Sequence, residues 1–236
     1  MQLDAVLFDI DDTLCRYRRS GAEILDAAFE RTGHEPFITL PEYHGHYPDF
    51  VDDSDSMDDL RERCFAAIAE SKGRDPASGR AVAQAYAAER DHGNVEPLPG
   101  VEDALSAVEG MPVGVVTNGA PEMQSQKLAG IGLEDAFDVV VHAGYDAPAK
   151  PNPEPFETAL SALSASPDRT LHVGNSLQSD VAGARAAGLG SVWVPDSDEP
   201  AEPEPDYTLS TLSEFPSLLS ERAAIDGQSG RAATDE

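Results

Sequence analysis

The chain begins with a short apolar run that ends abruptly at acidic residues. Residues 5–8 read Ala-Val-Leu-Phe, and Asp9, Asp11 and Asp12 follow almost at once. A continuous apolar run of this length, bounded by polar residues, is typical of a parallel strand buried on both faces. The pattern therefore predicts that Asp9 lies at the carboxyl end of a strand, which is where open α/β sheets bind their ligands.

The pattern between Arg16 and about Pro97 is helical. Apolar residues recur at helical spacing in three segments: 22–29, 60–71 and 79–90. No convincing strand interrupts them. His44 and His46 lie in a stretch rich in Tyr and Pro, which favours a loop, and their spacing is weak evidence for a metal site. This part of the chain is predicted to be a helical insertion.

Strand-like and helix-like segments alternate after Pro97. The predicted strands are 113–116, 138–141, 170–173 and 191–194, and the predicted helices are 101–109, 121–129, 153–163 and 181–187. Such an alternation predicts parallel strands joined by crossover helices. The expected fold class is therefore α/β, a doubly wound parallel sheet with a helical cap inserted after the first strand.

The domain boundaries follow from the same patterns. We expect an α/β core formed by residues 1–15 and 97–220, and a helical cap formed by residues 16–96. Residues 221–236 are expected to be a disordered tail. Residues 196–206 are rich in Pro, Asp and Glu and predict a solvated loop. The segment 207–219 is expected to form a short strand and a terminal helix.

The charge of the chain is strongly negative. There are 44 Asp and Glu against 16 Lys and Arg, giving a formal net charge of -28, and only three residues are lysines: Lys72, Lys127 and Lys150. Nucleic acid is therefore not an expected partner. Because 40% of the residues are hydrophobic and fall in regular periods, we expect a packed fold with the excess acid outside. This composition favours a halophilic origin.

The two cysteines and the apolar runs bear on localisation. Cys15 and Cys64 are too few for a disulfide framework and lack metal-ligand spacing. No stretch reaches the length of a membrane span, and the amino terminus shows no basic, apolar leader. We expect a cytoplasmic protein, a monomer or homodimer, that has no membrane partner.

Polar residues follow the ends of four predicted strands. They are Asp9 and Asp11 after the first, Thr117 and Asn118 after the second, Lys150 after the third, and Asn175 and Asp180 after the fourth. Loops at one edge of a parallel sheet converge, so we expect these residues to form one site. The crowded carboxylates would repel one another unless they shared a cation, and Mg²⁺ suits oxygen ligands. Asp can also act as a nucleophile in phosphoryl transfer.

These segments resemble the motifs of the haloacid dehalogenase superfamily of phosphohydrolases. The matching motifs are Asp-Ile-Asp-Asp-Thr at 9–13, Thr117, Lys150 before Pro151, and Gly-Asn-Ser-Leu-Gln-Ser-Asp at 174–180. The resemblance covers roughly residues 4 to 219. The order of the motifs, together with their places after the strands, carries the resemblance.

The resemblance implies a role for each matching residue. Asp9 would attack phosphorus, Asp11 would serve as acid and then base, and Thr117 would bind a phosphoryl oxygen. Lys150 would neutralise the transferring group, and the backbone amides near Asn118 and Gly119 would add donors.

The implied metal ligands are Asp9, Asp11, Asn175 and Asp180, holding Mg²⁺. Asn175 departs from the family's commonest pattern, which has Asp at this position. An amide oxygen can still ligate Mg²⁺, so Asn175 is either a neutral ligand or a helix cap. Asp180 is then expected to act as a ligand directly or through a water molecule.

The expected function is that of a Mg²⁺-dependent phosphatase acting through an aspartyl-phosphate intermediate. The substrate would be a small phosphorylated metabolite, such as a sugar phosphate or a compound like phosphoglycolate. Asp11 favours phosphate chemistry, because the dehalogenases of the superfamily lack this carboxylate. Two alternatives are a phosphomutase of the same superfamily and a non-catalytic binding protein with the same fold, the latter motivated by Asn175.

We expect the stability of the protein to depend on salt. The repulsion among surface carboxylates is unscreened in dilute buffer, so the chain should unfold there and refold in molar KCl. Circular dichroism across a KCl series measures this change. Equal stability at both extremes would contradict the halophilic interpretation.

Overall fold

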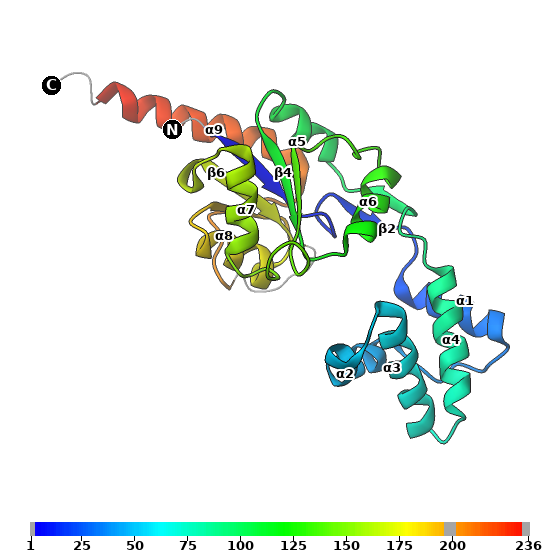
Figure 1. The fold of residues 1–236 in the computed structure, drawn as a ribbon. Helices are drawn as coiled ribbons and strands as arrows, with labels where there is room; N and C mark the ends of the chain where they lie inside the picture. The colour runs from blue at the N-terminus through cyan, green and yellow to red at the C-terminus, as the bar shows by residue number, and fades with distance from the viewer. Residues whose placement is uncertain (1–2, 196–201, 233–236) are drawn as a thin grey trace. The chain divides into compact units, whose positions relative to one another are not determined.

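The structure is a computed structural model that describes residues 3–195 and 202–232. The chain divides into two compact units, one formed by residues 1–16 and 95–236 and the other by residues 17–94 (Figure 1). The predicted loop at 196–206 and the predicted tail fall partly on 196–201 and 233–236, which lie outside the described residues.

The first unit is built on a six-stranded parallel sheet with the strand order β5-β4-β1-β6-β7-β8. Its strands are β1 (Ala5–Phe8), β4 (Val113–Thr117), β5 (Val139–His142), β6 (Thr170–Gly174), β7 (Gly190–Trp193) and β8 (Tyr207–Thr208). The apolar run at the start of the chain forms β1, which pairs with both β4 and β6 and is fully buried. Its carboxyl end therefore lies in the middle of the sheet edge.

Helices cover both faces of this sheet (Figure 1). They are α5 (Val101–Ala107), α6 (Pro121–Gly130), α7 (Glu154–Leu163), α8 (Ala182–Ala186) and α9 (Phe215–Ala232), with short helical turns η2 (Pro167–Arg169), η3 (Leu177–Val181) and η4 (Leu212–Glu214). Successive side chains of β1 point to opposite faces. Leu7 shares a hydrophobic cluster with Phe156 of α7, whereas the ring centroid of Phe8 lies 6.0 Å from that of Phe215 in α9. The predicted doubly wound α/β fold is confirmed.

The second unit is helical. It contains α1 (Gly21–Thr32), α2 (Leu40–Phe50), η1 (Val51–Asp53), α3 (Met57–Ser71) and α4 (Pro76–Glu89). Each of the four α-helices begins after a short polar residue whose side chain accepts a hydrogen bond from a backbone amide of the first turn: Ser20, Thr39, Ser56 and Asp75. Aromatic and aliphatic side chains, Phe29, Phe65 and Tyr86 among them, form its core. The predicted helical insertion after the first strand is thus present.

Three local predictions differ from the structure. His44 and His46 belong to α2 and not to a loop, because Thr39 and Glu42 form a capping box that starts a helix there. Two strands were not expected: β2 (Cys15–Tyr17) and β3 (Val95–Pro97) pair as a two-stranded sheet where the chain leaves and re-enters the first unit. Helix α9 continues to Ala232, where the sequence predicts disorder from residue 221.

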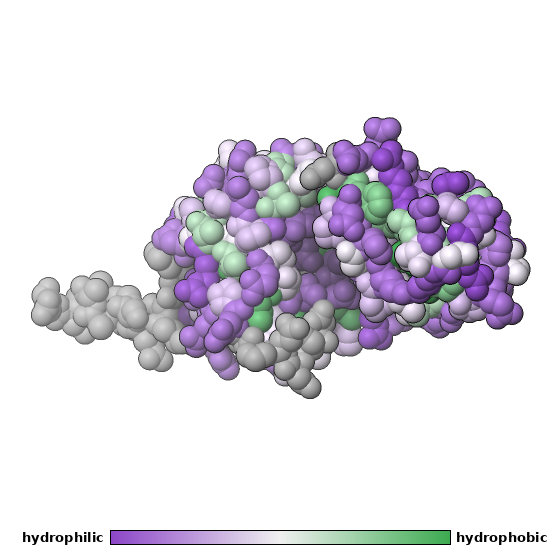
Figure 2. Space-filling model, turned by 90° about the horizontal axis from the view of Figure 1, so that it is seen from below, coloured by the Kyte–Doolittle hydropathy of each residue, from purple (hydrophilic) through white to green (hydrophobic). Residues whose placement is uncertain are grey.

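The face of the molecule in Figure 2 is dominated by hydrophilic residues, with small hydrophobic patches between them. Among the described residues, the acidic side chains that are buried are Asp9 and Asp180, which agrees with the expectation that the excess acid lies outside the core. Within residues 3–195 and 202–232, every helix is too short or too polar to cross a membrane.

We expect two glycines in helices to respond in opposite ways to alanine. A Cβ atom on Gly79 of α4 would lie 2.2 Å from the carbonyl oxygen of Phe65 in α3, so Gly79→Ala should lower the free energy of unfolding by about 2 kcal/mol through overpacking. Gly45 of α2 has no atom within 4 Å of such a Cβ, so Gly45→Ala should raise it by about 0.5 kcal/mol. Denaturant unfolding of both variants measures the contrast. Equal effects would contradict the close approach of α3 and α4.

Candidate active site

Loops at the carboxyl ends of β1, β4 and β6, together with the loop that follows β5, enclose a small cavity. Its volume is about 320 Å³ and it is lined by Asp9, Asp11, Asp12, Thr117, Asn118, Gly119, Lys150, Asn175, Ser179 and Asp180. The lining includes all eight residues to which the sequence analysis assigned a catalytic, phosphate-binding or metal-binding role: Asp9, Asp11, Thr117, Asn118, Gly119, Lys150, Asn175 and Asp180. The parallel sheet brings them together because each follows a strand that ends at the same edge.

Lys150 is the centre of a buried ion-pair network. Its ammonium nitrogen lies 2.7 Å from Asp9 Oδ1 and 2.6 Å from Asp180 Oδ1, and it donates to the carbonyl oxygen of Val116 at 2.7 Å. Lys150 is only 5% exposed. Burial alone would lower the pKa of its ammonium group, but the charges of Asp9 and Asp180 outweigh burial and raise it. Lys150 is therefore a fixed positive charge in this cavity.

Asn118 holds the backbone of Lys150. Its Oδ1 accepts a hydrogen bond from the amide of Lys150 at 2.8 Å, and its Nδ2 donates to the carbonyl oxygen of the same residue at 3.2 Å. This paired contact ties the loop after β5 to the end of β4. The side chain of Asn118 thus positions the lysine, a contact that the sequence did not reveal.

Asp9 is buried, and its backbone is held by the neighbouring strand. Its amide donates to Val173 of β6 at 2.9 Å, which keeps it in line with the sheet, and the residue is 6% exposed. Burial raises the pKa of its carboxyl group to about 7, against the opposing charge of Lys150, and the charge of Asp180 adds to the increase. A divalent cation at this position would favour the ionised form.

Asp180 is 1% exposed and already hydrogen-bonded at both oxygens. Oδ1 accepts from Lys150 and from His172 Nε2 at 3.0 Å, and Oδ2 accepts from the amide of Ser176 at 3.0 Å. Burial opposes ionisation, but the charge of Lys150 and the hydrogen bond from His172 hold the pKa of Asp180 below its usual range. A Cβ atom on Gly174 would lie 2.3 Å from Asp180 Cγ, so glycine is needed there. These contacts favour a supporting role for Asp180.

The residues expected to bind metal all line the cavity and carry carboxylate or amide oxygens: Asp9, Asp11, Asn175 and Asp180. Hard oxygen donors of this kind fit Mg²⁺. Across the described parts of the chain, no three His, Cys, Asp or Glu side chains form a ready-made metal cluster. One of the four donors here is an amide, and the ammonium of Lys150 lies between two of the others. Both oxygens of Asp11 and both oxygens of Asp180 already accept hydrogen bonds, so the fit rests mainly on Asp9 and on the side chain of Asn175.

The sequence analysis did not predict that two side chains of α6 lie at this site. Gln124 Nε2 donates to Asp11 Oδ2 at 2.7 Å and to Thr117 Oγ1 at 3.0 Å, and Lys127 forms an ion pair with Asp11 Oδ1. Lysine is so rare in this chain that the same reasoning that drew attention to Lys150 could have identified Lys127.

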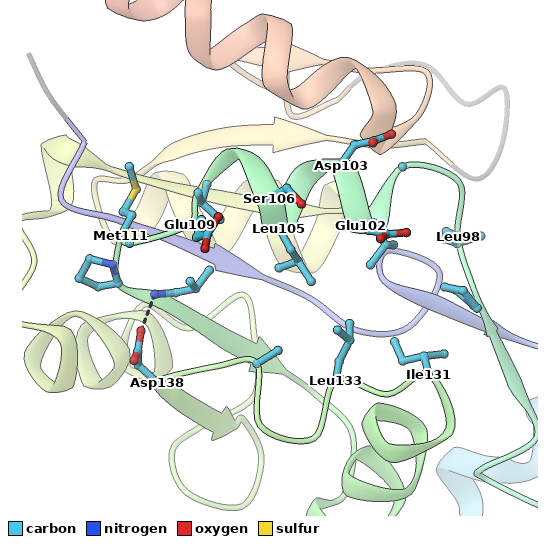
Figure 3. A pocket seen from close by; sticks show the side chains of 18 of the residues that line it. Leu98, Glu102, Asp103, Leu105, Ser106, Glu109, Met111, Ile131, Leu133 and Asp138 are labelled. Atoms are coloured by element: carbon cyan, nitrogen blue, oxygen red, sulfur yellow. Dashed lines mark hydrogen bonds between the residues drawn. The ribbon is translucent and has the colours of Figure 1, made fainter.

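A larger cavity of about 1370 Å³ lies at the opposite, amino edge of the sheet (Figure 3). It is lined by α5 and by residues that precede β4 and β5, among them Glu102, Glu109 and Asp138, whose carboxylate accepts a hydrogen bond from the amide of Val113. Its ionisable lining side chains are acidic, and none of the predicted site residues lies there. The predicted site residues therefore gather at the smaller cavity.

Comparisons with known proteins agree with this arrangement. The family model described as haloacid dehalogenase-like hydrolase matches residues 3–188. A phosphoserine phosphatase of Thermus thermophilus is 36% identical over 157 residues, which are 66% of this chain and 63% of that protein, so the match spans less than two thirds of the relative's length. A glyceraldehyde 3-phosphate phosphatase of Methanopyrus kandleri is 30% identical over 199 residues, covering 81% of this chain and 84% of that protein.

A solved structure shows the same fold. The putative hydrolase YfnB of Bacillus subtilis, bound to magnesium, has a TM-score of 0.72 and 24% identity to this chain, covering 93% of this chain and 100% of that one. The family model spans most of the 236 residues, and it includes every residue that lines the candidate site. This protein therefore belongs to the haloacid dehalogenase-like hydrolases.

Proposed function

We propose that this protein is a Mg²⁺-dependent phosphatase that hydrolyses a small phosphorylated metabolite through an aspartyl-phosphate intermediate. One observation carries the proposal: a buried lysine joins the carboxylate of Asp9 to that of Asp180 in a cavity that also contains Asp11 and Thr117. Phosphoryl transfer depends mainly on positioning and on neutralising charge, and this cavity supplies fixed groups for both.

In the first half of the reaction, Asp9 attacks phosphorus. Lys150 engages Oδ1 of Asp9, so we assign the attack to Oδ2. A bond forms between this oxygen and phosphorus while the bond from phosphorus to the leaving oxygen breaks, and Asp11 gives a proton to that oxygen. The ammonium of Lys150 and the hydroxyl of Thr117 stabilise the charge on the transferring group.

In the second half, water attacks the phosphorus of the aspartyl-phosphate. Asp11, now ionised, takes a proton from the water, and the carboxylate of Asp9 is released with inorganic phosphate. Asp9 and Asn175 would hold Mg²⁺, with Asp180 behind them orienting Lys150. The cation would supply charge neutralisation on the phosphoryl oxygens.

The similarity to two phosphatases supports this choice of reaction, and the magnesium in the related solved structure supports the choice of metal. The names of these two relatives give different substrates, phosphoserine and glyceraldehyde 3-phosphate. We therefore assign a substrate class, small phosphate monoesters. Assays with a panel of phosphorylated metabolites identify the leaving group.

Removing the nucleophile should abolish phosphate release. Asp9→Asn keeps the shape of the side chain but removes the attacking carboxylate, so release from a panel of phosphorylated metabolites should fall by at least about 1000-fold. The assay measures inorganic phosphate with Mg²⁺ and with chelator, and isomer formation in parallel identifies a mutase. Asp135→Asn, at an exposed position outside the cavity, is the matched control. Metal-dependent release by Asp9→Asn at the wild-type rate would exclude the mechanism.

A charge at position 175 should strengthen metal binding. Asn175→Asp adds one negative charge to the ligand set, so the Mg²⁺ concentration for half-maximal activity should fall about 3- to 10-fold. Asn152→Asp, exposed and outside the cavity lining, controls for the change in total charge. If Asn175→Asp instead needs more Mg²⁺, the amide of Asn175 acts as a donor and is not a ligand.

A further inference from the structure

Helix α6 turns two polar side chains toward the candidate site. Gln124 and Lys127 are three residues apart, so they lie on the same side of the helix. Gln124 is fully buried and Lys127 is 3% exposed, which is rare for lysine unless it is paired. On the opposite side of this helix, Ser125, Gln126 and Ala129 are exposed.

Both buried side chains end on the carboxylate of Asp11. Gln124 Nε2 donates to Oδ2 at 2.7 Å, and the ammonium of Lys127 pairs with Oδ1. With one donor on each oxygen, the carboxylate cannot rotate without breaking a hydrogen bond. A carboxylate has about four lone-pair sites, so two remain for proton exchange in the cavity. Asp11 is thus held in one orientation while its side chain stays 43% exposed.

The same glutamine connects Asp11 to the last residue of β4. Its Nε2 also donates to Thr117 Oγ1 at 3.0 Å. This approach requires a glycine at position 119, because a Cβ atom there would lie 1.7 Å from Gln124 Nε2. The loop after β4 is therefore shaped to let Gln124 reach the end of β1, which indicates a built arrangement.

We propose that Gln124 and Lys127 are positioning residues that hold Asp11 for proton transfer. The inference rests on the proposed phosphatase function, in which Asp11 gives its proton to the leaving oxygen and later accepts one from the attacking water. Lys127 and Gln124 keep their own protons throughout and do not touch the phosphoryl group. Lys127 thereby serves Asp11 as Lys150 serves Asp9: each lysine fixes a carboxylate whose position decides one part of the reaction.

We call the contacts of Gln124 and Lys127 with Asp11 the clamp. Its loss should slow protonation of the leaving group and hydrolysis of the aspartyl-phosphate, which both need Asp11. It should spare the attack on a substrate whose leaving group needs no proton. In Lys127→Met, kcat for glycerol phosphate should fall about 10- to 100-fold, which is less than the full effect of losing a general acid-base catalyst. KM should change by less than about 2-fold. With p-nitrophenyl phosphate, whose leaving group needs no proton, the burst of p-nitrophenol should persist within about 3-fold of wild type while the steady state slows.

Matched variants distinguish a loss of the positioning of Asp11 from general damage to the fold. Gln126→Met changes an exposed glutamine of the same helix and should leave both phases unchanged. Lys127→Arg should restore part of the activity, because it restores a cation near Asp11. In the Asp11→Asn background, Lys127→Met should cause no further loss of kcat. Equal losses in both backgrounds, or a burst that slows as much as the steady state, would overturn the proposal.

A stability cycle tests the contact without turnover. The change in Tm caused by Lys127→Met should differ by at least about 2 °C between the wild-type and Asp11→Asn backgrounds, because the two side chains are coupled. Identical changes would refute the clamp. If wild type releases no phosphate from any compound, the proposed function fails, and this cycle still decides whether Lys127 holds Asp11.

Discussion

The structure depends above all on balancing charge where β1 ends. Asp9 and Asp180 are buried within reach of one ammonium group, that of Lys150. Moving an ion out of water costs several kcal/mol even after relaxation, so each of these groups is tolerable only because the others are present. Their positions are therefore mutually determined.

Several neighbouring features serve to keep Lys150 in place. The backbone of Lys150 is fixed by Asn118, its ammonium donates to the carbonyl of Val116, and one of its carboxylate partners is held from behind by His172. Burial lowers the pKa of His172, so this imidazole is neutral and adds no second positive charge. Strand β6 thus contributes a hydrogen bond without disturbing the balance.

The sequence was informative wherever a residue stood directly after a strand. The apolar run at 5–8 and the alternation after Pro97 predicted the sheet, and the sheet brought Asp9, Thr117 and Asp180 to one edge. Strands β2 and β3 escaped prediction because three residues are too few to show a period. Helix α2 escaped prediction because Gly45 and Pro48 weaken its helical pattern. The capping box that begins at Thr39 could have been recognised in the sequence.

The roles of helix residues were harder to predict than those of strand ends. Gln124 and Lys127 lie in an ordinary helical pattern, and only the placement of α6 beside the end of β1 brings them to Asp11. The saturation of both oxygens of Asp180 likewise depends on packing between β6 and the turn that follows it. Local pattern cannot reveal such contacts because they join segments far apart in the chain.

The scarcity of lysine gives this protein an unusual spectroscopic property. Lys127 and Lys150 are buried in the candidate site, and Lys72 lies in the helical unit, where its ammonium donates to the carbonyl of Phe37. A sample labelled with ¹⁵N only at the side-chain nitrogen of lysine would give three ammonium resonances. Two would report the electrostatics of the cavity directly, and the third would serve as an internal reference from the other unit.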